Sequence, residues 1–234
     1  DFDLIIHTAG GSSVGKSFTE TSDDFLNTSF STLQVLEYIR LFNPHCKLIY
    51  TSSPAAQGNM QDKMIKEDFI SSLSSPYGLN KKICEQMCMF YYENFKIKIG
   101  IIRFFSVYGV GLKKQLLWDA CNKINNNDFV FNGTGNETRD WININDVVSL
   151  IKILNNSLLD YKLINCGSGI RTQNKELIKL IFNEMGVNSK PMFNGICRDG
   201  DPKYFWADIS KAKKLGWDPK IKISEGIKEF VNYY

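Results

Sequence analysis

Residues 3–11 carry the sequence DLIIHTAGG, an apolar run that ends in two glycines. A short apolar run bounded by glycine is typical of a buried strand in a parallel sheet, where both faces of the strand are covered. Residues 46–50 and 97–103 have the same character. We therefore predict three buried strands, over residues 3–9, 46–50 and 97–103.

Amphipathic helices are predicted between these strands. The first follows the capping-type residues 21–24 and has apolar positions from Phe25 to about Phe42. The second runs from Tyr77 to about Asn94, and Pro76 suits its first turn because proline lacks the N–H group that would go unpaired there. The order strand, helix, strand, helix, strand predicts an α/β fold with a doubly wound parallel sheet.

The pattern after Gly109 is less regular. The predicted elements are helices over residues 113–125 and from about 146, strands over 129–131 and near 163–165, and helices near 173–185, 209–215 and 224–234. No internal repeat, low-complexity tract or linker is evident. A chain of 234 residues is long enough for one domain with a smaller lobe.

The composition indicates a small-molecule partner. The formal net charge is +3 and the lysines are scattered without a basic block, so no nucleic acid partner is expected. No apolar run reaches membrane-spanning length, and the first residues lack the charged and apolar parts of a signal peptide. We therefore expect no membrane association and a cytoplasmic location.

The six cysteines are expected to be reduced and mostly buried. They lie at Cys46, Cys84, Cys88, Cys121, Cys166 and Cys197. No two of them form the close pairs that are typical of zinc sites or redox motifs. We expect no metal site.

A hydroxyl, a phenol and an ammonium give the strongest indication of chemistry. Ser53 follows the second predicted strand, and Tyr77 and Lys81 share one face of the second helix. A phenol has a pKa near 10, so it is a base near neutrality only if its anion is stabilised by roughly 4 kcal/mol, about three pKa units. A cation about 4 Å from the phenolate oxygen supplies on the order of 4 kcal/mol at an effective dielectric of 20. We predict that Ser53, Tyr77 and Lys81 are catalytic and that Lys81 lowers the pKa of Tyr77.

The same spacing recurs near the end of this helix, in Tyr92 and Lys96. Roughly one such pair is expected by chance in a chain this rich in tyrosine and lysine. Tyr92 lies in an amphipathic helix end with no hydroxyl-rich strand to face, so we assign it a structural role. Tyr77 lies where a loop meets a helix, and functional sites favour such junctions.

Residues 10–17, GGSSVGKS, fit the P-loop pattern and follow a predicted strand. A P-loop requires a helix that begins at residues 15–17, so that its amide groups point at phosphate. Residues 18–24 are polar without helical periodicity, so we predict that the helix starts too late. The next strand also ends in hydroxyl residues and not in an aspartate that could hold magnesium. A P-loop NTPase is the remote alternative.

Several motifs resemble those of the extended short-chain dehydrogenase/reductase family, specifically its nucleotide-sugar epimerases, dehydratases and reductases. The motifs are residues 7–10 (HTAG), 51–53 (TSS), the Tyr77–Lys81 pair, 103–109 (RFFSVYG), 139–146 (RDWININD), 165–169 (NCGSG), 198–201 (RDGD) and 207–212 (ADISKA). Each is weak alone. Their common order and spacing over almost the whole chain make the resemblance specific, and in this family residues 10–17 would form a loop toward the next helix.

The resemblance implies a Rossmann-type dinucleotide-binding domain, residues 1–108 and 141–166, and a smaller α/β substrate-binding lobe, residues 109–140 and 167–234. It implies NAD or NADP as cofactor and a sugar nucleotide as substrate. The residues implied to bind the cofactor are His7, Ala9, Gly10, Asn27, Tyr77, Lys81, Phe104 and Ser106.

The residues implied to bind the substrate are Ser53, Ser106, Arg139 and Arg198. The two arginines are suited to its diphosphate, because a guanidinium matches phosphate oxygens bidentately; the alternative is a surface salt bridge. The resemblance also implies a homodimer, formed as in the family through the helix that contains Tyr77 and the predicted helix before it.

One family feature has no counterpart in this sequence. The Gly-x-x-Gly-x-x-Gly fingerprint, which belongs to a first strand and helix, is not matched. The resemblance therefore implies that roughly 60 residues of the usual fold are lacking, at about 20 residues per strand–helix unit. The residue that selects NAD over NADP belongs to that part, so the choice stays open.

Departures from the family motifs narrow the expected chemistry. Pro54 and Ala55 follow Ser53, where resembling dehydratases carry an acidic pair, and neither can move a proton, so elimination is disfavoured. Gln57 replaces a usual tyrosine and Ser106 an asparagine. We favour a 4-epimerase that acts by reversible hydride transfer at carbon 4 of the sugar. A 4-ketoreductase acting on a nucleotide-linked deoxy-keto sugar would use the same residues and is the alternative.

Overall fold

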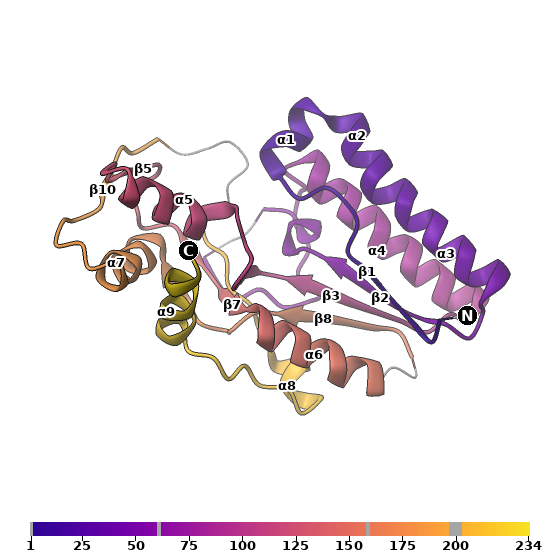
Figure 1. Ribbon diagram of the computed structural model, residues 1–234. Coiled ribbons are helices and arrows are strands. Elements are labelled where there is room, and N and C mark those ends of the chain that lie inside the picture. Colours follow the sequence, from indigo (N-terminus) through magenta and orange to yellow (C-terminus); the bar gives the residue numbers. More distant parts are fainter. Residues whose placement is uncertain (1, 60–61, 158–159, 197–202) are drawn as a thin grey trace.

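The computed structural model describes residues 2–59, 62–157, 160–196 and 203–234. Its centre is a parallel sheet with strands in the order β1 (Leu4–His7), β2 (Lys47–Ser52), β3 (Ile99–Phe104) and β8 (Lys162–Cys166) (Figure 1). The register aligns His7 with Tyr50 and Tyr50 with Ile101, so the carboxyl ends of the strands meet at one edge. The predicted parallel α/β sheet is confirmed.

Helices cover both faces of this sheet (Figure 1). The helices α3 (Ser31–Phe42) and α4 (Pro76–Phe95) lie on one face, and α6 (Ile144–Ser157) and α8 (Ser210–Lys214) lie on the other. Successive residues of a strand point to opposite faces: Tyr50 packs with α3 and α4, whereas Ile49 packs with α6. Burial on both faces explains why β2 and β3 are almost continuous apolar runs in the sequence. The prediction of a buried strand is wrong for β1, in which only His7 is buried and Ile6 is 43% exposed.

The segment between β1 and α3 is helical from residue 14 onward, apart from Glu20. It contains α1 (Val14–Thr19), α2 (Thr21–Phe25) and the π-helix η1 (Leu26–Phe30), which continues into α3. The prediction that the helix starts too late for residues 15–17 is therefore wrong. Periodicity could not find α1, because Ser17 is its buried residue and a single buried serine leaves no apolar stripe.

Helix α4 has clear start and stop signals. Ser75 caps it by accepting a hydrogen bond from the Gly78 N–H at 3.1 Å, and Pro76 occupies the first turn. Beyond Phe95, Lys96 takes a left-handed conformation with φ 59°. The predicted span from Tyr77 to about Asn94 differs from the observed one by a single residue at each end.

A smaller α/β lobe occupies the left of Figure 1. Its helices are α5 (Gln115–Asn125), α7 (Asn174–Glu184) and α9 (Ile223–Tyr233), and its strands β5 (Val130–Phe131) and β10 (Met192–Phe193) pair in parallel. The three helices share one apolar cluster that includes Leu117, Phe182 and Phe230. The smaller lobe thus has a hydrophobic core of its own.

Two further strand pairs join segments that are distant in sequence. They are β4 (Ser106–Tyr108) with β7 (Trp141–Asn143), which are parallel, and β6 (Thr138–Arg139) with β9 (Thr172–Gln173), which are antiparallel. Strands of two or three residues carry too little periodicity to be predicted. The predicted division of the chain at residues 108, 140 and 166 stays a prediction.

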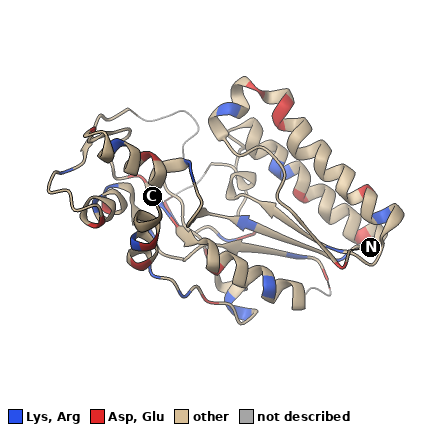
Figure 2. Cartoon of the chain, viewed as in Figure 1, with Lys and Arg blue, Asp and Glu red and all other residues tan. Residues whose placement is uncertain are grey.

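Charge and cysteines are distributed without large clusters. Figure 2 shows Lys and Arg spread over both parts of the chain and mixed with Asp and Glu. Within the described ranges no helix is long and apolar enough to cross a membrane, and no three His, Cys, Asp or Glu side chains are grouped as metal ligands would be. The cysteines of these ranges are buried free thiols, as predicted; Cys197 lies outside the described residues.

Candidate active site

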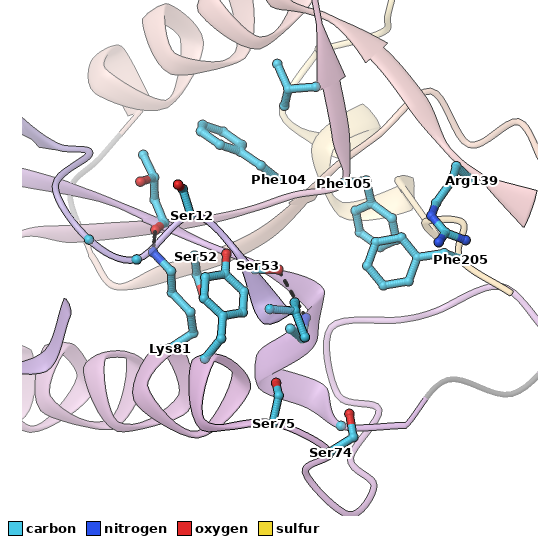
Figure 3. A pocket seen from close by; sticks show the side chains of 18 of the residues that line it. Ser12, Ser52, Ser53, Ser74, Ser75, Lys81, Phe104, Phe105, Arg139 and Phe205 are labelled. Carbon is cyan, nitrogen blue, oxygen red and sulfur yellow. Dashed lines mark hydrogen bonds between the residues drawn. The ribbon is translucent and has the colours of Figure 1, made fainter. Parts of the chain in front are cut away.

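A cavity of about 720 Å³ opens at the carboxyl ends of β1, β2 and β3, beside the smaller lobe. Doubly wound sheets bind their ligands at this edge, and the volume is in the range of small-molecule sites. Figure 3 shows Ser53 and Lys81 on one side of the cavity and Arg139 with Phe205 on the other. The sheet and the lobe therefore contribute opposite walls.

Tyr77 lies in the first turn of α4 and lines the cavity. Its backbone N–H donates to the buried Ser17 Oγ at 3.1 Å, which fixes the start of α4 against α1. Burial raises the pKa of the phenol above its ordinary value, and the nearby Asp24 raises it further. The Ser53 side chain acts in the opposite direction and lowers this pKa.

Ser53 follows β2 and precedes the 3-10 turn η2 (Pro54–Gln57). Its Oγ accepts a hydrogen bond from the Ala55 N–H at 3.2 Å, and its side chain lines the cavity beside that of Tyr77. Pro54 fixes φ directly after the serine and has no N–H of its own. The turn therefore holds the Ser53 hydroxyl at the end of the strand, facing the phenol.

Lys81 lies one helical turn beyond Tyr77 and is only 5% exposed. Its Nζ donates a hydrogen bond to the Thr51 carbonyl at 3.0 Å, and it lies 5.8 Å from the centre of the Tyr77 ring. Burial lowers the pKa of Lys81, partly offset by Cys84 and by acidic neighbours. The structure thus brings together Ser53, Tyr77 and Lys81, the three residues predicted to be catalytic.

The electrostatics of Tyr77 differ from the sequence prediction. We predicted that Lys81 lowers the pKa of the phenol, whereas the pKa is raised, because the loss of hydration on burial outweighs the lowering by Ser53. The sequence argument assumed an ammonium about 4 Å from the phenol oxygen. In the structure that ammonium is hydrogen-bonded to Thr51.

The three predicted cofactor-binding residues around β1 lie in different places, and only Gly10 lines the cavity. A Cβ atom placed on Gly10 would lie 3.5 Å from the Lys81 Nζ. His7 is buried behind the wall with its Nε2 3.1 Å from the Thr32 Oγ1, and burial, followed by the charge of Lys81, lowers its pKa. Ala9 is exposed and does not line the cavity.

On the helix that follows, the structure turns Thr28 and not Asn27 toward the cavity wall. Thr28 is fully buried, and its Oγ1 accepts a hydrogen bond from the Gly11 N–H at 2.7 Å. Asn27 is exposed and lines a smaller neighbouring cavity. Both residues belong to the π-helix η1, whose wider turn changes which side chains face inward. A pattern search at the α-helical period cannot detect that change.

The remaining predicted residues lie toward the smaller lobe. Phe104 lines the cavity, while Ser106 lies in β4, where its N–H donates to the Asp140 carbonyl at 2.9 Å. Arg139 is half-buried and lines the cavity, with its Nη1 donating to the Thr138 carbonyl at 2.9 Å. Arg198 lies outside the described residues.

Sequence reasoning missed several lining residues of the lobe side. Lys203, Tyr204 and Phe205 line the cavity directly before the motif at residues 207–212, and their position there is the one signal that could have indicated them. Gln115 also lines it, with φ 67°, a conformation that is uncommon for a residue with a side chain. No local pattern marks Gln115.

The P-loop-like segment forms part of the cavity wall. Its helix begins at Val14, so a late start is no longer a reason to reject a P-loop. The rejection now rests on Ser17, whose hydroxyl would be needed for magnesium. Ser17 is 1% exposed, and its hydroxyl donates to the Val14 carbonyl at 2.7 Å and accepts from the Tyr77 N–H.

Comparison with known families identifies the chain. The family model described as GDP-mannose 4,6 dehydratase matches residues 1–230. The chain belongs to this family. The match extends over both the sheet and the smaller lobe, and the predicted resemblance to the extended short-chain dehydrogenase/reductases is confirmed.

Similar proteins of this family include named sugar-nucleotide epimerases. A putative UDP-glucose 4-epimerase of Methanocaldococcus jannaschii is 28% identical over 240 residues, which cover 100% of this chain and 77% of the relative. The UDP-glucose 4-epimerase of Thermotoga maritima, solved with UDP-glucose, has a TM-score of 0.90 at 26% identity, covering 99% of this chain and 76% of that one. The UDP-glucuronic acid 4-epimerase of Bacillus cereus, solved with UDP-glucuronic acid and NAD, has a TM-score of 0.89 at 26% identity, with 99% and 74% covered.

Proposed function

We propose that this chain carries the catalytic site of an NAD-dependent nucleotide-sugar 4-epimerase. The observation that carries the proposal is that Ser53, Tyr77 and the buried Lys81 line one cavity at the carboxyl ends of parallel strands. The names and bound ligands of the relatives support it, because they describe 4-epimerases of UDP-sugars.

The cavity wall suits the nicotinamide end of a dinucleotide. The ammonium of Lys81 has three N–H donors, and one of them donates to the Thr51 carbonyl. The other two can donate to the hydroxyl groups of a ribose. Gly10 keeps this stretch of wall open, since a Cβ atom there would meet Thr28 Oγ1 at 3.3 Å and Lys81 Nζ at 3.5 Å. When bound, NAD would accept a hydride from carbon 4 of the sugar and return it. We propose NAD and keep NADP as the alternative.

The three residues of the sheet side have distinct tasks in this proposal. Tyr77, as phenolate, takes the proton from the hydroxyl at carbon 4 and later returns it. Ser53 hydrogen-bonds the same sugar oxygen and holds it in line with the phenol. Lys81 stabilises the phenolate by its positive charge and donates hydrogen bonds to the cofactor.

The lobe side of the cavity is proposed to hold the substrate diphosphate. Arg139 lies on the wall opposite Ser53 and Lys81 (Figure 3). A guanidinium suits phosphate because it offers parallel N–H donors. Arg198 is proposed for the same diphosphate from its sequence motif alone, and Ser106 remains a proposal for both ligands.

An epimerase is favoured over a dehydratase or a reductase. Elimination of water needs a second acid or base beside the phenol, and the residues after Ser53 are Pro54 and Ala55. A single proton shuttle suffices for reversible oxidation at carbon 4. A ketoreductase would need no more than that, and the named 4-epimerases among the relatives decide the preference.

A two-part assay on the full-length protein tests the proposal. We expect interconversion of two UDP-sugars by chromatography, with no net change in the reduced-nicotinamide absorbance. Arg139→Ala should weaken sugar-nucleotide binding about 10- to 100-fold, the range for charge-assisted hydrogen bonds, and leave dinucleotide affinity nearly unchanged. Stoichiometric consumption of reduced cofactor with a 4-keto sugar nucleotide, and no isomer from any UDP, GDP, CDP or dTDP sugar, would establish the reductase instead.

We further propose a homodimer through the outer face of α3 and α4, which lie side by side (Figure 1). Large apolar side chains are exposed on these helices and on α2 and η1, which precede α3: Phe25, Leu26, Phe30, Leu41, Phe42, Leu79, Met89 and Phe90. Exposed apolar surface of this extent is characteristic of protein interfaces, and one shared face suits a two-fold dimer. Light scattering should give twice the chain mass for the wild type and the monomer mass for a Leu41→Glu, Met89→Glu variant; a monomeric wild type would exclude the dimer.

The free, buried cysteines support the proposed cytoplasmic location, since reducing compartments keep thiols unpaired. Fractionation of the source cells, followed by detection of the protein, tests it. Recovery with a membrane or secreted fraction would contradict it.

A further inference from the structure

The buried ammonium of Lys81 lies against a second aromatic ring, that of Tyr50. Tyr50 belongs to β2 and is fully buried, and the centre of its ring is 5.2 Å from the Lys81 Nζ. The next residue of the same strand, Thr51, accepts the hydrogen bond from this Nζ at 3.0 Å. Two consecutive residues of β2 therefore hold the ammonium, one through its ring and the other through its carbonyl.

An aromatic ring attracts a cation because the face of its π-system is negative. The attraction operates within about 6 Å of the ring centre and is strongest where water is excluded. Lys81 is 5% exposed, so its charge has lost most of its hydration, which is why burial lowers the pKa of this lysine. The Tyr50 ring is closer to the Nζ than the Tyr77 ring is, at 5.2 Å against 5.8 Å.

The carboxylates near Lys81 are bound by other residues and do not hold its ammonium. The titratable groups around Lys81 are His7 on β1, Asp24 on α2, and Tyr77, Cys84 and Glu85 on α4. The Asp24 carboxylate accepts a hydrogen bond from the Asn80 side chain at 2.6 Å, and Glu85 is bound by Arg103 at 2.7 and 2.8 Å. Within the described ranges, no carboxylate forms an ion pair with Lys81.

We propose that Tyr50 is a positioning residue of this site, whose ring holds the ammonium of Lys81 beside Tyr77. Tyr50 does not line the cavity, so it touches neither ligand and acts only through Lys81. Its phenol oxygen is buried without a hydrogen-bond partner among the described residues, so the contact with Lys81 is made by the ring. The contact is independent of the reaction, and its link to turnover rests on the proposed function.

A purely packing role is the alternative explanation for Tyr50. The side chain belongs to the apolar cluster between the sheet and α3 and α4, and its ring centre lies 5.9 Å from that of His7. Any large change at this position will therefore lower stability. An experiment on Tyr50 must therefore distinguish the effect of losing its aromatic ring face from the effect of losing side-chain volume.

Two substitutions and one control make that separation. Tyr50→Phe keeps the ring and removes only the hydroxyl, whereas Tyr50→Leu fills space without a π-face. Tyr91→Leu is the matched control: Tyr91 is 7% exposed in the same cluster, and its ring contacts Phe90 and Phe95. All three are made in the full-length protein and studied at a temperature where each is folded by circular dichroism.

The first measurement is the pH dependence of kcat/KM for epimerisation. Tyr50→Leu should raise the apparent pKa of the essential base by about one unit, because a displaced ammonium stabilises the phenolate less, and should lower kcat/KM near neutral pH about tenfold. The loss should recover at high pH. Tyr50→Phe and Tyr91→Leu should keep the wild-type profile within twofold.

The second measurement does not depend on activity. The Nζ of Lys81 is titrated by nitrogen-15 NMR, with Lys81→Arg identifying its signal. Loss of the π-face should lower the lysine pKa in Tyr50→Leu, whereas Tyr50→Phe and Tyr91→Leu should match the wild type.

The outcomes separate the two proposals. A Tyr50→Leu titration that matches the wild type, or a Tyr50→Phe shift as large as that of Tyr50→Leu, would overturn the role of the ring. A wild-type protein without epimerase activity would overturn the proposed function, and the NMR titration would still decide whether the ring holds the ammonium. A shifted NMR titration with an unchanged rate profile would overturn the positioning role in catalysis.

Discussion

The two ends of helix α4 carry the same spacing of residues in different surroundings. At the amino-terminal end, Tyr77 lines the cavity together with Ser53 and precedes the buried Lys81. At the carboxyl-terminal end, Tyr92 packs against Tyr161 with ring centres 5.7 Å apart. Lys96 is exposed there, and its Nζ donates to a carbonyl of its own helix at 2.7 Å.

What differs between the pairs is the neighbouring strand and not the helix. Tyr77 and Lys81 lie beside the carboxyl end of β2, where Thr51 and Ser53 supply a carbonyl and a hydroxyl. The other end of α4 lies away from that edge of the sheet (Figure 1). A tyrosine and a lysine four residues apart therefore become a candidate site only where a strand end presents polar groups to both.

The largest expected effect comes from exchanging the two phenols for phenyl rings. Tyr77→Phe should reduce turnover about 10³-fold, within the range for loss of a general acid–base group, because only the ionisable oxygen is removed. Tyr92→Phe should keep the wild-type rate within twofold. Steady-state kinetics on both variants checks this, and equal rates would remove the functional difference between the two ends.

The pH dependence of turnover should also differ between the Tyr77 and Tyr92 variants. Burial raises the pKa of Tyr77 above the ordinary phenol value near 10. The active phenolate is therefore lost as the pH falls through this raised pKa. Wild-type activity should therefore rise with pH from neutral to alkaline conditions, as should that of Tyr92→Phe. The residual activity of Tyr77→Phe should be flat over the same range, and a rising profile for this variant would assign the titration to another group.

A smaller effect is expected from the lysines. Lys81→Ala should lower turnover about 10²-fold and weaken dinucleotide binding, because the ammonium is placed to act on both the phenol and the cofactor. Lys96→Ala should change neither quantity measurably. Calorimetric titration with NAD and a rate assay test both variants, and a loss of NAD affinity in Lys96→Ala would contradict the comparison.

The helix ends should also respond differently in stability. Ser75→Ala removes the cap from the Gly78 N–H and should lower the free energy of unfolding by about 1 kcal/mol. Lys96→Gly, at a residue with φ 59°, should leave stability unchanged or raise it by up to about 1 kcal/mol. Urea unfolding measures both changes, and destabilisation by the glycine would mean that the Lys96 side chain matters more than its backbone.

The smallest effect is expected for Lys16, in the P-loop-like segment near the amino-terminal end of α4. Lys16 is exposed, so Lys16→Ala should leave turnover within twofold. Calorimetry should show no ATP binding to the wild type. Micromolar, magnesium-dependent ATP binding that disappears in the variant would restore the NTPase interpretation.

The sequence was sufficient for the parallel strands, although not for the exposure of β1, and for α4 and the pairing of Tyr77 with Lys81. Strands covered on both faces must be apolar at nearly every position, and such runs are visible without a structure. Ser75 and Pro76 mark the start of α4, and the helical period places residues four apart on one face. The parallel sheet then leads Ser53 to the same edge, which explains why the three residues predicted to be catalytic line one cavity.

Only the tertiary structure decided which side chains line the site and how burial shifts the pKa values of its ionisable groups. It turned Thr28 inward in place of Asn27, brought Lys203 and Phe205 to the cavity, and placed the Tyr50 ring against Lys81. It also raised the pKa of Tyr77, where the sequence predicted a lowering. The physical reason is that periodicity reports contacts within a single segment, whereas side-chain direction and burial depend on how separate segments pack together.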